Sequence, residues 1–261
     1  MLIEYLDFAS NSDKVCLPLN QTELVILVGL TGVGKTTVTD ALQKHITFTL
    51  LPNRRQVTDE FIIASLQKED GEAVHPVTDR LKRLEYTARY RAQYPGGMAH
   101  ALSRLAVDPQ QVTFPLIFDG LRGQNEVQHA LHFFPHARFL ILDAPDSVRL
   151  NRLLNRGDAF DRINFDAVVG QDTLTALQAI PHIDLVFSPA DLHKISQTTA
   201  ELAVDDVVKK AALIVKERQN YDSQAARAFL TQHLPANRVL VIDTAAHAPA
   251  AIVEHIKPWL R

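Results

Sequence analysis

The sequence predicts an α/β protein with three layers, in which a mostly parallel sheet carries helices on both faces. Residues 24–28 (LVILV) form an unbroken apolar run, which is typical of a strand buried on both faces of a parallel sheet. Further apolar runs of strand length at 47–51, 114–118, 138–142 and 239–242 alternate with stretches of helical periodicity. With hydrophobic residues at 46%, the chain has enough apolar side chains to build a core between these layers.

Composition limits the classes of function. The net charge is −3 and no long Lys/Arg run occurs, so nucleic acid is not expected as the main partner. The single cysteine, Cys16, excludes an internal disulfide framework and fits a reducing compartment. The N-terminus lacks the basic region of a signal peptide, and no apolar run approaches the ~20 residues needed to span a membrane. We therefore expect a cytoplasmic protein without a membrane partner.

The first buried strand leads into a phosphate-binding motif. The letters GLTGVGKT at 29–36 fit G-x-x-x-x-G-K-[ST], in which glycines let backbone N–H groups curl around a phosphate chain. Lys35 is expected to reach the β- and γ-phosphates, and the Thr36 hydroxyl to ligate Mg²⁺. The expected nucleotide-binding residues are Gly29, Leu30, Thr31, Gly32, Val33, Gly34, Lys35, Thr36 and Thr37. The alternative, a glycine-rich turn that binds nothing, does not explain why strand, loop and helix follow in the required order.

A hairpin is expected before this motif and a second strand after its helix. Residues 1–8 and 15–19, separated by a turn-rich stretch, are expected to form a hairpin. Residues 47–51 predict a second strand. The pair Arg54 and Arg55 follows that strand and either contacts a phosphate or is a solvated surface pair.

Two helices are expected between the second and third strands. Thr58 and Asp59 are expected to begin a helix that continues through Leu66. Thr78 or Asp79 is expected to begin the next helix, which stops before a Tyr-Pro-Gly-Gly turn. Its arginines are Arg80, Arg83, Arg89 and Arg91. They either face solvent or hold a phosphorylated acceptor.

The third strand, 114–118, ends at a candidate metal ligand. Asp119 follows the strand directly, and a carboxylate at that position beside a phosphate loop can hold Mg²⁺. Gly120 would allow a sharp turn and place Arg122 beside the phosphate. Asp143, at the end of the fourth strand, is the rival for the metal position. The alternative role for Asp119 is a helix or turn cap.

A helix over 125–133 and a strand over 138–142 follow, and then a helix begun by Asp146 or Ser147. Arginines recur in that last helix at spacings that place them on one face: Arg149, Arg152 and Arg156. Without intervening carboxylates they repel one another, which an anion would relieve. The alternative is a stripe of arginines that faces solvent.

The remaining third predicts further elements of the same kinds. Residues 184–188 (DLVFS) are expected to form a strand, and 195–218 a long helix. A helix over 222–234, a strand over 239–242 and a closing helix over 249–260 complete the chain. The loop between the last strand and helix, Thr244 to Pro249, is the candidate contact for the nucleotide base.

These segments resemble the adenylate kinase-like group of P-loop kinases, over about Leu24 to Asp161. The segments GLTGVGKTT, FDGLRGQNEVQHAL and FLILDAPDSVRLNRLLNRGD are similar to that group's phosphate loop, acceptor segment, and strand with lid helix. The last two are also similar to dephospho-coenzyme A kinase-like proteins. The resemblance implies a P-loop NTPase fold, with Asp119 linked to the metal and Arg122 near the acceptor phosphate. It also implies that Arg152 and Arg156 grip the triphosphate.

The expected function is that of an ATP- and Mg²⁺-dependent phosphotransferase acting on a small, nucleotide-like or phosphorylated acceptor. The expected catalytic residues are Lys35, Asp119, Arg122, Arg152 and Arg156, and the expected metal ligands are Thr36 and Asp119. One domain is expected over 1–261: a hairpin (1–23), a nucleotide and acceptor core (24–188), a helical elaboration (189–236), and the last strand and helix (237–261). The alternatives are a regulatory ATPase with a protein partner and a polynucleotide kinase.

Overall fold

The computed structural model describes residues 4–9, 16–155 and 172–260, and its strands form two sheets. The larger sheet has five parallel strands in the order β4-β6-β3-β7-β8. Its strands are β3 (Leu24–Val28), β4 (Thr49–Leu50), β6 (Leu116–Leu121), β7 (Arg138–Asp143) and β8 (Val239–Asp243). All five residues of β3 are buried, as its unbroken apolar run requires, and β3 is the central strand.

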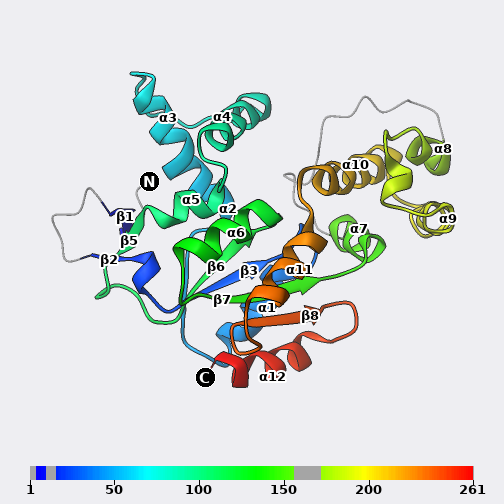
Figure 1. Ribbon diagram of the computed structural model, residues 1–261. Coiled ribbons are helices and arrows are strands. Elements are labelled where there is room, and N and C mark those ends of the chain that lie inside the picture. The colour runs from blue at the N-terminus through cyan, green and yellow to red at the C-terminus, as the bar shows by residue number, and fades with distance from the viewer. Residues whose placement is uncertain (1–3, 10–15, 156–171, 261) are drawn as a thin grey trace.

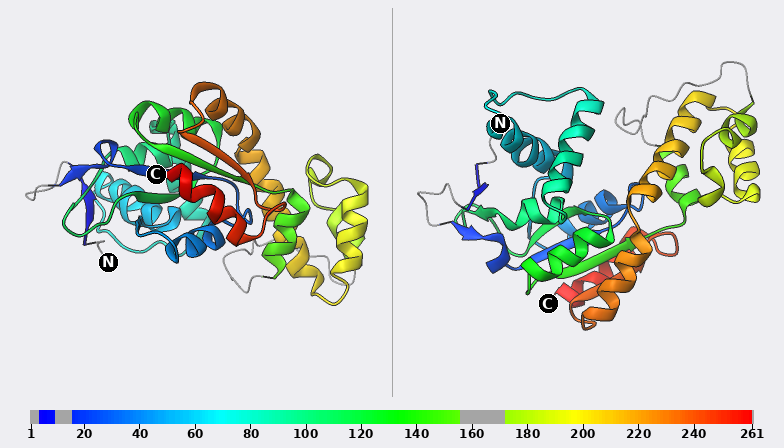
Figure 2. Two further views of the ribbon diagram at one scale, coloured as in Figure 1. Left: turned by 90° about the horizontal axis from the view of Figure 1, so that it is seen from below. Right: turned by 45° about the horizontal axis from the view of Figure 1, so that its top comes forward.

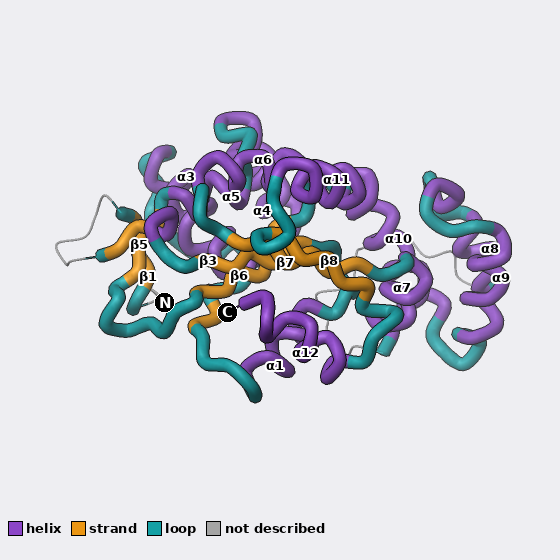
Figure 3. Tube along the Cα trace, turned by 60° about the horizontal axis from the view of Figure 1, so that its bottom comes forward, coloured by secondary structure: helices purple, strands orange, loops and turns teal. Residues whose placement is uncertain are grey.

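Helices cover both faces of this sheet, which confirms the predicted three-layer α/β fold (Figure 3). One face packs against α5 (Met98–Ser103), α6 (Gln124–Phe133) and α11 (Ser223–His233). The other face packs against α1 (Lys35–Gln43) and α12 (Pro249–Leu260).

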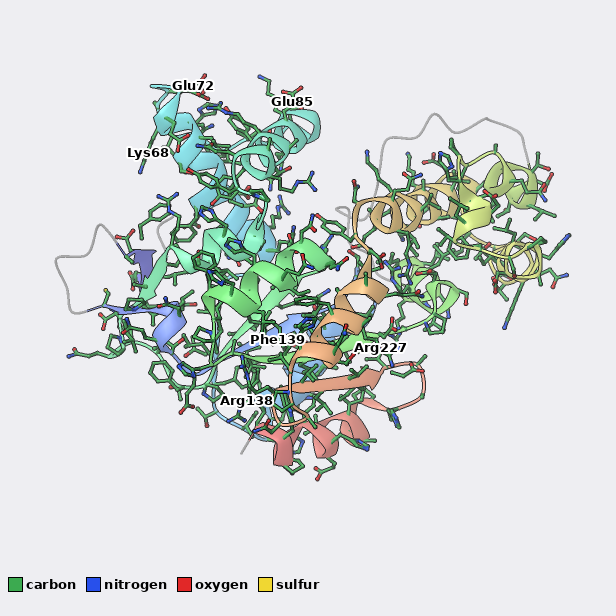
Figure 4. The ribbon with its side chains drawn as sticks, viewed as in Figure 1. Lys68, Glu72, Glu85, Arg138, Phe139 and Arg227 are labelled. Atoms are coloured by element: carbon green, nitrogen blue, oxygen red, sulfur yellow. The ribbon has the colours of Figure 1, made fainter. Side chains whose placement is uncertain are left out.

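Alternate residues of the strands supply the two cores. Ile26 and Phe139 belong to the cluster under α6 and α11, whereas Leu27 and Leu140 belong to the cluster under α1 and α12. Phe139 lies in the middle of the molecule, beneath the helices of its face (Figure 4).

Two groups of helices project beyond the sheet (Figures 1 and 2). The first arm consists of α2 (Arg54–Val57), a π-helical stretch η2 (Thr58–Ile63), α3 (Ala64–Glu69) and α4 (Arg80–Gln93). Lys68, Glu72 and Glu85 lie near its outer end (Figure 4).

The second group has its own hydrophobic core. It consists of α7 (Asp146–Leu154), α8 (Thr173–Gln178), the short η4 (Ile183–Leu185), α9 (Pro189–Thr198) and α10 (Val204–Asn220). A cluster of buried side chains runs from Leu150 and Leu153 of α7 to Val215 of α10 and is separate from the two sheet cores. We call α8, η4, α9 and α10 the helical unit.

The predicted N-terminal hairpin is wrong. Strands β1 (Leu6–Phe8) and β2 (Leu17–Pro18) do not pair with each other. Each pairs antiparallel with β5 (Leu105–Val107), which lies between them, and the 3₁₀ turn η1 (Leu19–Gln21) then leads into the main sheet. The buried run Leu105–Val107 supplies the apolar partner that two short edge strands need.

Two predictions in the last third are also wrong. Residues 184–188 form no strand, because Ser188 instead begins α9 with a capping box to Asp191 and a proline at the first helical turn. The helix predicted over 195–218 is two helices, α9 and α10, interrupted at 199–203.

Other boundaries differ by smaller amounts. The first helix after β4 begins at Arg54, not at Thr58, because Asn53 forms a capping box with Gln56. Asp79 caps α4 as predicted, and α12 has the predicted bounds. No helix in the described ranges is long and apolar enough to cross a membrane.

Candidate active site

The phosphate loop lies between β3 and α1, at the carboxyl edge of the parallel sheet. Gly32 (φ 84°) and Gly34 (φ 94°) adopt left-handed conformations that other residues rarely take. A Cβ atom on Gly29 would lie 2.6 Å from the Leu142 carbonyl oxygen, so only glycine fits there. Gly34 is the N-cap of α1, which directs the positive end of that helix into the loop.

Lys35 reaches back over this loop. Its Nζ atom donates to the carbonyl oxygens of Gly29 (3.0 Å) and Leu30 (3.1 Å) and lies 3.7 Å from Asp119 Oδ1. Burial lowers the pKa of Lys35, while Asp119 acts in the opposite direction. The ammonium group is therefore held at the loop with little water around it, where it would act strongly on a phosphate.

Asp119 lies inside β6, opposite Leu27 of β3, and not after the strand as predicted. The strand continues through a bulge at Gly120, because Asp119 pairs with Leu27 and Leu121 pairs with Val28. The sharp turn predicted at Gly120 is therefore absent.

The residues present fit a magnesium ion. Asp119 Oδ1 is buried and has no hydrogen-bond donor within the described part of the chain. The Thr36 hydroxyl lies in the first turn of α1, next to Lys35. A carboxylate and a hydroxyl beside a phosphate loop are oxygen ligands of the kind that Mg²⁺ prefers. Asp143, the other candidate for the metal position, is instead paired with Arg227, its Oδ2 lying 3.4 Å from Nη1. Its Oδ1 accepts from the main-chain N–H of Ala144, directly after β7.

Arg122 and Arg149 meet at a carboxylate that the sequence did not single out. Glu217 of α10 forms an ion pair with Arg122, whose Nη1 lies 2.9 Å from Oε1, and accepts a hydrogen bond from Arg149 Nη2. It also accepts from the main-chain N–H of Thr31 (3.0 Å) and from its hydroxyl (2.8 Å). The alternative interpretation of the α7 arginines, a stripe that faces solvent, is wrong for Arg149, which also pairs with Asp146 and is completely buried.

Arg54 binds a second buried carboxylate, that of Glu126. Its two terminal nitrogens donate to Glu126, at 2.9 Å and 2.6 Å, and also to the Gly120 carbonyl oxygen (2.6 Å). Glu126 also accepts from the main-chain N–H of Arg122 (3.0 Å). Arg54 and Arg122 both lie over the ring of Tyr221, with the central carbon of each guanidinium at 5.5 and 5.6 Å from the ring centroid. The Arg54 guanidinium is therefore not free to hold an acceptor phosphate.

Arg152 lies at the other side of the loop, beside a cavity. It donates to Thr244 Oγ1 (2.9 Å) and to the Thr244 carbonyl oxygen (2.7 Å), and its Nη1 is 3.3 Å from the Gly32 carbonyl oxygen. The cavity has a volume of about 390 Å³. It is lined by Gly32, Gly34, Thr37, Val38, Arg152, Asn155, Thr244, His247, Pro249 and Ile252. The structure thus brings the predicted base loop next to the phosphate loop.

The structure brings together most of the predicted residues. Lys35, Asp119 and Arg122 lie on one side of the phosphate loop and Arg152 on the other, whereas Arg156 lies outside the described residues. Sequence analysis missed Glu126, Tyr221 and Glu217. Glu217 stands 186 positions from Thr31, and no local pattern marks it.

One family model matches the chain. Its description is AAA domain, and it covers residues 25–168, more than half of the sequence. The match runs from β3 to beyond α7 and includes the loop, Lys35, Asp119 and Arg122. It does not extend to Glu217. No curated protein matches the chain.

Solved structures are similar only in a loose sense. A sugar kinase from a Janibacter species is 18% identical, with 92% of this chain and 94% of that chain covered and a TM-score of 0.38. A gluconokinase from Sinorhizobium meliloti is 13% identical (92% and 91% covered, TM-score 0.41). A sulfotransferase from Alicyclobacillus acidocaldarius is 11% identical (90% and 79% covered, TM-score 0.38). With TM-scores below 0.5, these likenesses support no conclusion about chemistry.

Proposed function

The chain belongs to the AAA domain family, and we propose that it is a P-loop phosphotransferase that moves the γ-phosphoryl group of ATP to a small molecule. One observation carries the proposal. The buried ammonium of Lys35 lies over the phosphate loop and 3.7 Å from Asp119, whose Oδ1 atom has no hydrogen-bond donor in the described part of the chain. A cation and an unsatisfied carboxylate oxygen at this point suit a triphosphate with its metal.

The donor nucleotide would lie along the loop. The N–H groups of the loop and of the first turn of α1 would bind the phosphates, and Lys35 would contact the β- and γ-phosphates. The base would enter the cavity of about 390 Å³ between Arg152 and the loop from Thr244 to Pro249. The bonds of Arg152 to Thr244 and Gly32 support this placement, because they hold its guanidinium at the boundary between phosphate and base.

Thr36 and Asp119 would hold Mg²⁺, which neutralises phosphate charge when bound. The residues of the chain supply orientation and charge. Lys35 and Arg122 would stabilise the negative charge on the oxygens of the transferring group. The resemblance to the adenylate kinase-like group also implies that Arg156 contacts the triphosphate, and we keep that contact as part of the proposal.

The acceptor would bind on the side of Arg122 and α2. Its oxygen attacks the γ-phosphorus while the bond from that phosphorus to the bridging oxygen breaks. ADP leaves with that electron pair, and the acceptor hydroxyl loses its proton to solvent. A nucleotide-like or phosphorylated acceptor, and membership of the adenylate kinase-like group, remain part of the proposal. Arg122 is the residue proposed to meet the acceptor, since both terminal nitrogens of Arg54 are bonded to Glu126, whereas Arg122 pairs with Glu217 through Nη1.

The test is an ATP-to-ADP assay with Mg²⁺, first in water alone and then with nucleosides, nucleoside monophosphates, dephospho-coenzyme A and sugars. The proposal predicts ADP formation that depends on one acceptor class. Asp119→Asn should lower the rate by about a hundredfold, while Asp143→Asn should leave it within about threefold. Slow ATP hydrolysis at a rate that no acceptor changes would contradict the kinase proposal and favour an ATPase with a protein partner.

A further inference from the structure

Glu217 connects the helical unit to the phosphate loop. It lies near the end of α10, and its carboxylate meets the loop at Thr31, 186 positions earlier in the chain. Both carboxylate oxygens lie 3.0 Å from the Thr31 main-chain nitrogen, and one lies 2.8 Å from the Thr31 hydroxyl. One residue of the loop thus bonds to the carboxylate through two donors.

Two arginines complete the surroundings of this carboxylate. Arg149 donates to Glu217 through Nη2 and to the Thr31 carbonyl oxygen through Nε at 2.7 Å. The main chain of Thr31 is therefore held on both sides, at its N–H by Glu217 and at its carbonyl by Arg149. Arg122 forms an ion pair with the other carboxylate oxygen, its Nη1 lying 2.9 Å from Glu217 Oε1.

The group is buried and charged. The side chain of Glu217 is 3% exposed and that of Arg149 is not exposed at all. Burial raises the pKa of Glu217, but Arg122, Arg149 and the Thr31 donors together outweigh it and keep that pKa below its usual range. A carboxylate that stays ionised at neutral pH is a fixed charge rather than a proton acceptor.

The position of Arg122 depends on this fixed charge. Its Nη1 atom pairs with Glu217 at 2.9 Å, while its Nε atom is buried without a hydrogen-bond acceptor among the residues that the structure describes. Arg122, Glu217 and Arg149 all lie close enough to Lys35 to influence its pKa. The whole group therefore adjoins the point where the γ-phosphoryl group would lie.

We propose that Glu217 is a positioning residue for phosphoryl transfer, which fixes the phosphate loop through Thr31 and Arg149 and aims the guanidinium of Arg122. The inference rests on the proposed function and adds to it a residue outside the span of the family match. It also gives the helical unit a role, because a displacement of α10 would move the carboxylate that the loop and Arg122 share.

The first test compares Glu217→Gln with Asp205→Asn. Glutamine keeps the shape and one oxygen acceptor for Thr31 but removes the charge that orients two arginines. We expect kcat to fall by about tenfold or more, while KM for ATP changes by less than about threefold. Asp205 lies on the same helix in a half-buried pair with Lys209, away from the phosphate loop, and its variant should match the wild type. Assays are run below the unfolding midpoint of each variant.

A double-mutant cycle separates positioning from stability. If Glu217 acts through Arg122, the substitution Glu217→Gln should cost much less in an Arg122→Ala background than in the wild type. Equal costs in both backgrounds would overturn the proposal. If Glu217→Gln does not fold, Thr31→Val serves instead, since it removes one donor to Glu217 and leaves the buried ion pairs; it should lower kcat by about threefold.

Hydrogen exchange gives a readout that needs no activity. In Glu217→Ala, the amide of Thr31 should exchange at least about tenfold faster, because its buried acceptor is gone. Unchanged exchange would overturn the contact of Glu217 with the loop even if the protein proves to be a kinase. Conversely, failure to find phosphoryl transfer would contradict the proposed function while faster exchange still supported the action of Glu217 on the loop.

Discussion

Arg149 illustrates what local spacing can and cannot predict about a residue. It lies in α7 three positions before Arg152, as the spacing indicates, but it bonds to Thr31 and Glu217, whereas Arg152 bonds to Gly32 and Thr244. Its partners were not predicted, because Glu217 comes from a distant helix, although Asp146 three positions earlier was a visible signal. Lys35 and Asp119 were predicted to lie near each other because a motif places the first and a buried strand beside the phosphate loop carries the second, although Asp119 lies inside that strand and not after it. Residues whose roles depend on long-range packing, such as Glu217 and Tyr221, leave no such signal.

The buried pair of Arg54 and Glu126 gives a prediction for stability. Glu126 is 4% exposed and accepts from Arg54 at 2.6 Å. Glu126→Ala should lower the free energy of unfolding by about 3 kcal/mol, because it leaves a largely buried guanidinium without its carboxylate. Urea denaturation measures this. In the control Glu254→Ala, at a side chain that is 66% exposed, the change should stay within about 0.5 kcal/mol. Equal effects of the two variants would contradict the importance of this pair.

The lowered pKa of His100 leads us to expect that the free energy of unfolding depends on pH. Burial, with His129 and Arg104 nearby, lowers the pKa of His100 to about 4. Its Nδ1 lies 2.9 Å from the hydroxyl of Tyr90, whose pKa burial raises to about 12, so two uncharged groups share this hydrogen bond. The unfolded chain, with the ordinary histidine pKa of about 6.5, binds more protons between these values, so stability falls as the pH drops from 6.5 towards 4.

Urea denaturation at a series of pH values measures this effect. His100→Gln should show a smaller loss of stability on acidification than the wild type, because one group that must take up a proton is gone. His255→Gln, at an exposed histidine, should keep the wild-type slope. A slope for His100→Gln as steep as that of the wild type would show that His100 does not titrate as described.

At the scale of elements, the sequence predicted the parallel strands and several helices but not every boundary. The strands β3, β7 and β8 follow from continuous apolar runs, and α12 from its periodicity. The strand predicted over 184–188 is wrong because a short apolar run fits either a strand or a helix. The capping signal of Ser188, with a proline after it, favoured the helix. The hairpin failed because pairing of short edge strands depends on a partner far along the chain, β5.

The capping box at the start of α2 gives a prediction at this scale. The Asn53 side chain accepts from the N–H groups of Arg55 and Gln56, and Gln56 accepts from the Asn53 N–H. Asn53→Ala should lower the free energy of unfolding by about 1 kcal/mol, since these donors lose their acceptor. Thermal or urea unfolding measures it. Gln128→Ala, at an exposed position within α6, should change stability by less than about 0.5 kcal/mol.

At the scale of the whole molecule, the chain combines a parallel sheet with two helical projections. The two sheet cores hold the phosphate loop, Asp119 and the cavity beside Arg152, whereas the core that α7 shares with the helical unit is separate. Glu217 and Asp146 connect that unit to the loop through Arg149, and Arg218 of α10 adds a bond to Asp146 at 3.0 Å. The single domain expected over 1–261 stays a prediction. The separate core that α7 shares with the helical unit is the feature that bears on it.

The proposed function requires that the loop between β3 and α1 bind a nucleoside triphosphate, which calorimetric titration with ATP and Mg²⁺ measures. The proteins compared are the wild type, Lys35→Ala, and the control Lys44→Ala, whose lysine is exposed at the end of α1. We predict equal dissociation constants for the wild type and Lys44→Ala, and binding at least about tenfold weaker for Lys35→Ala. Absence of binding to the wild type, or unchanged affinity in Lys35→Ala, would contradict the account.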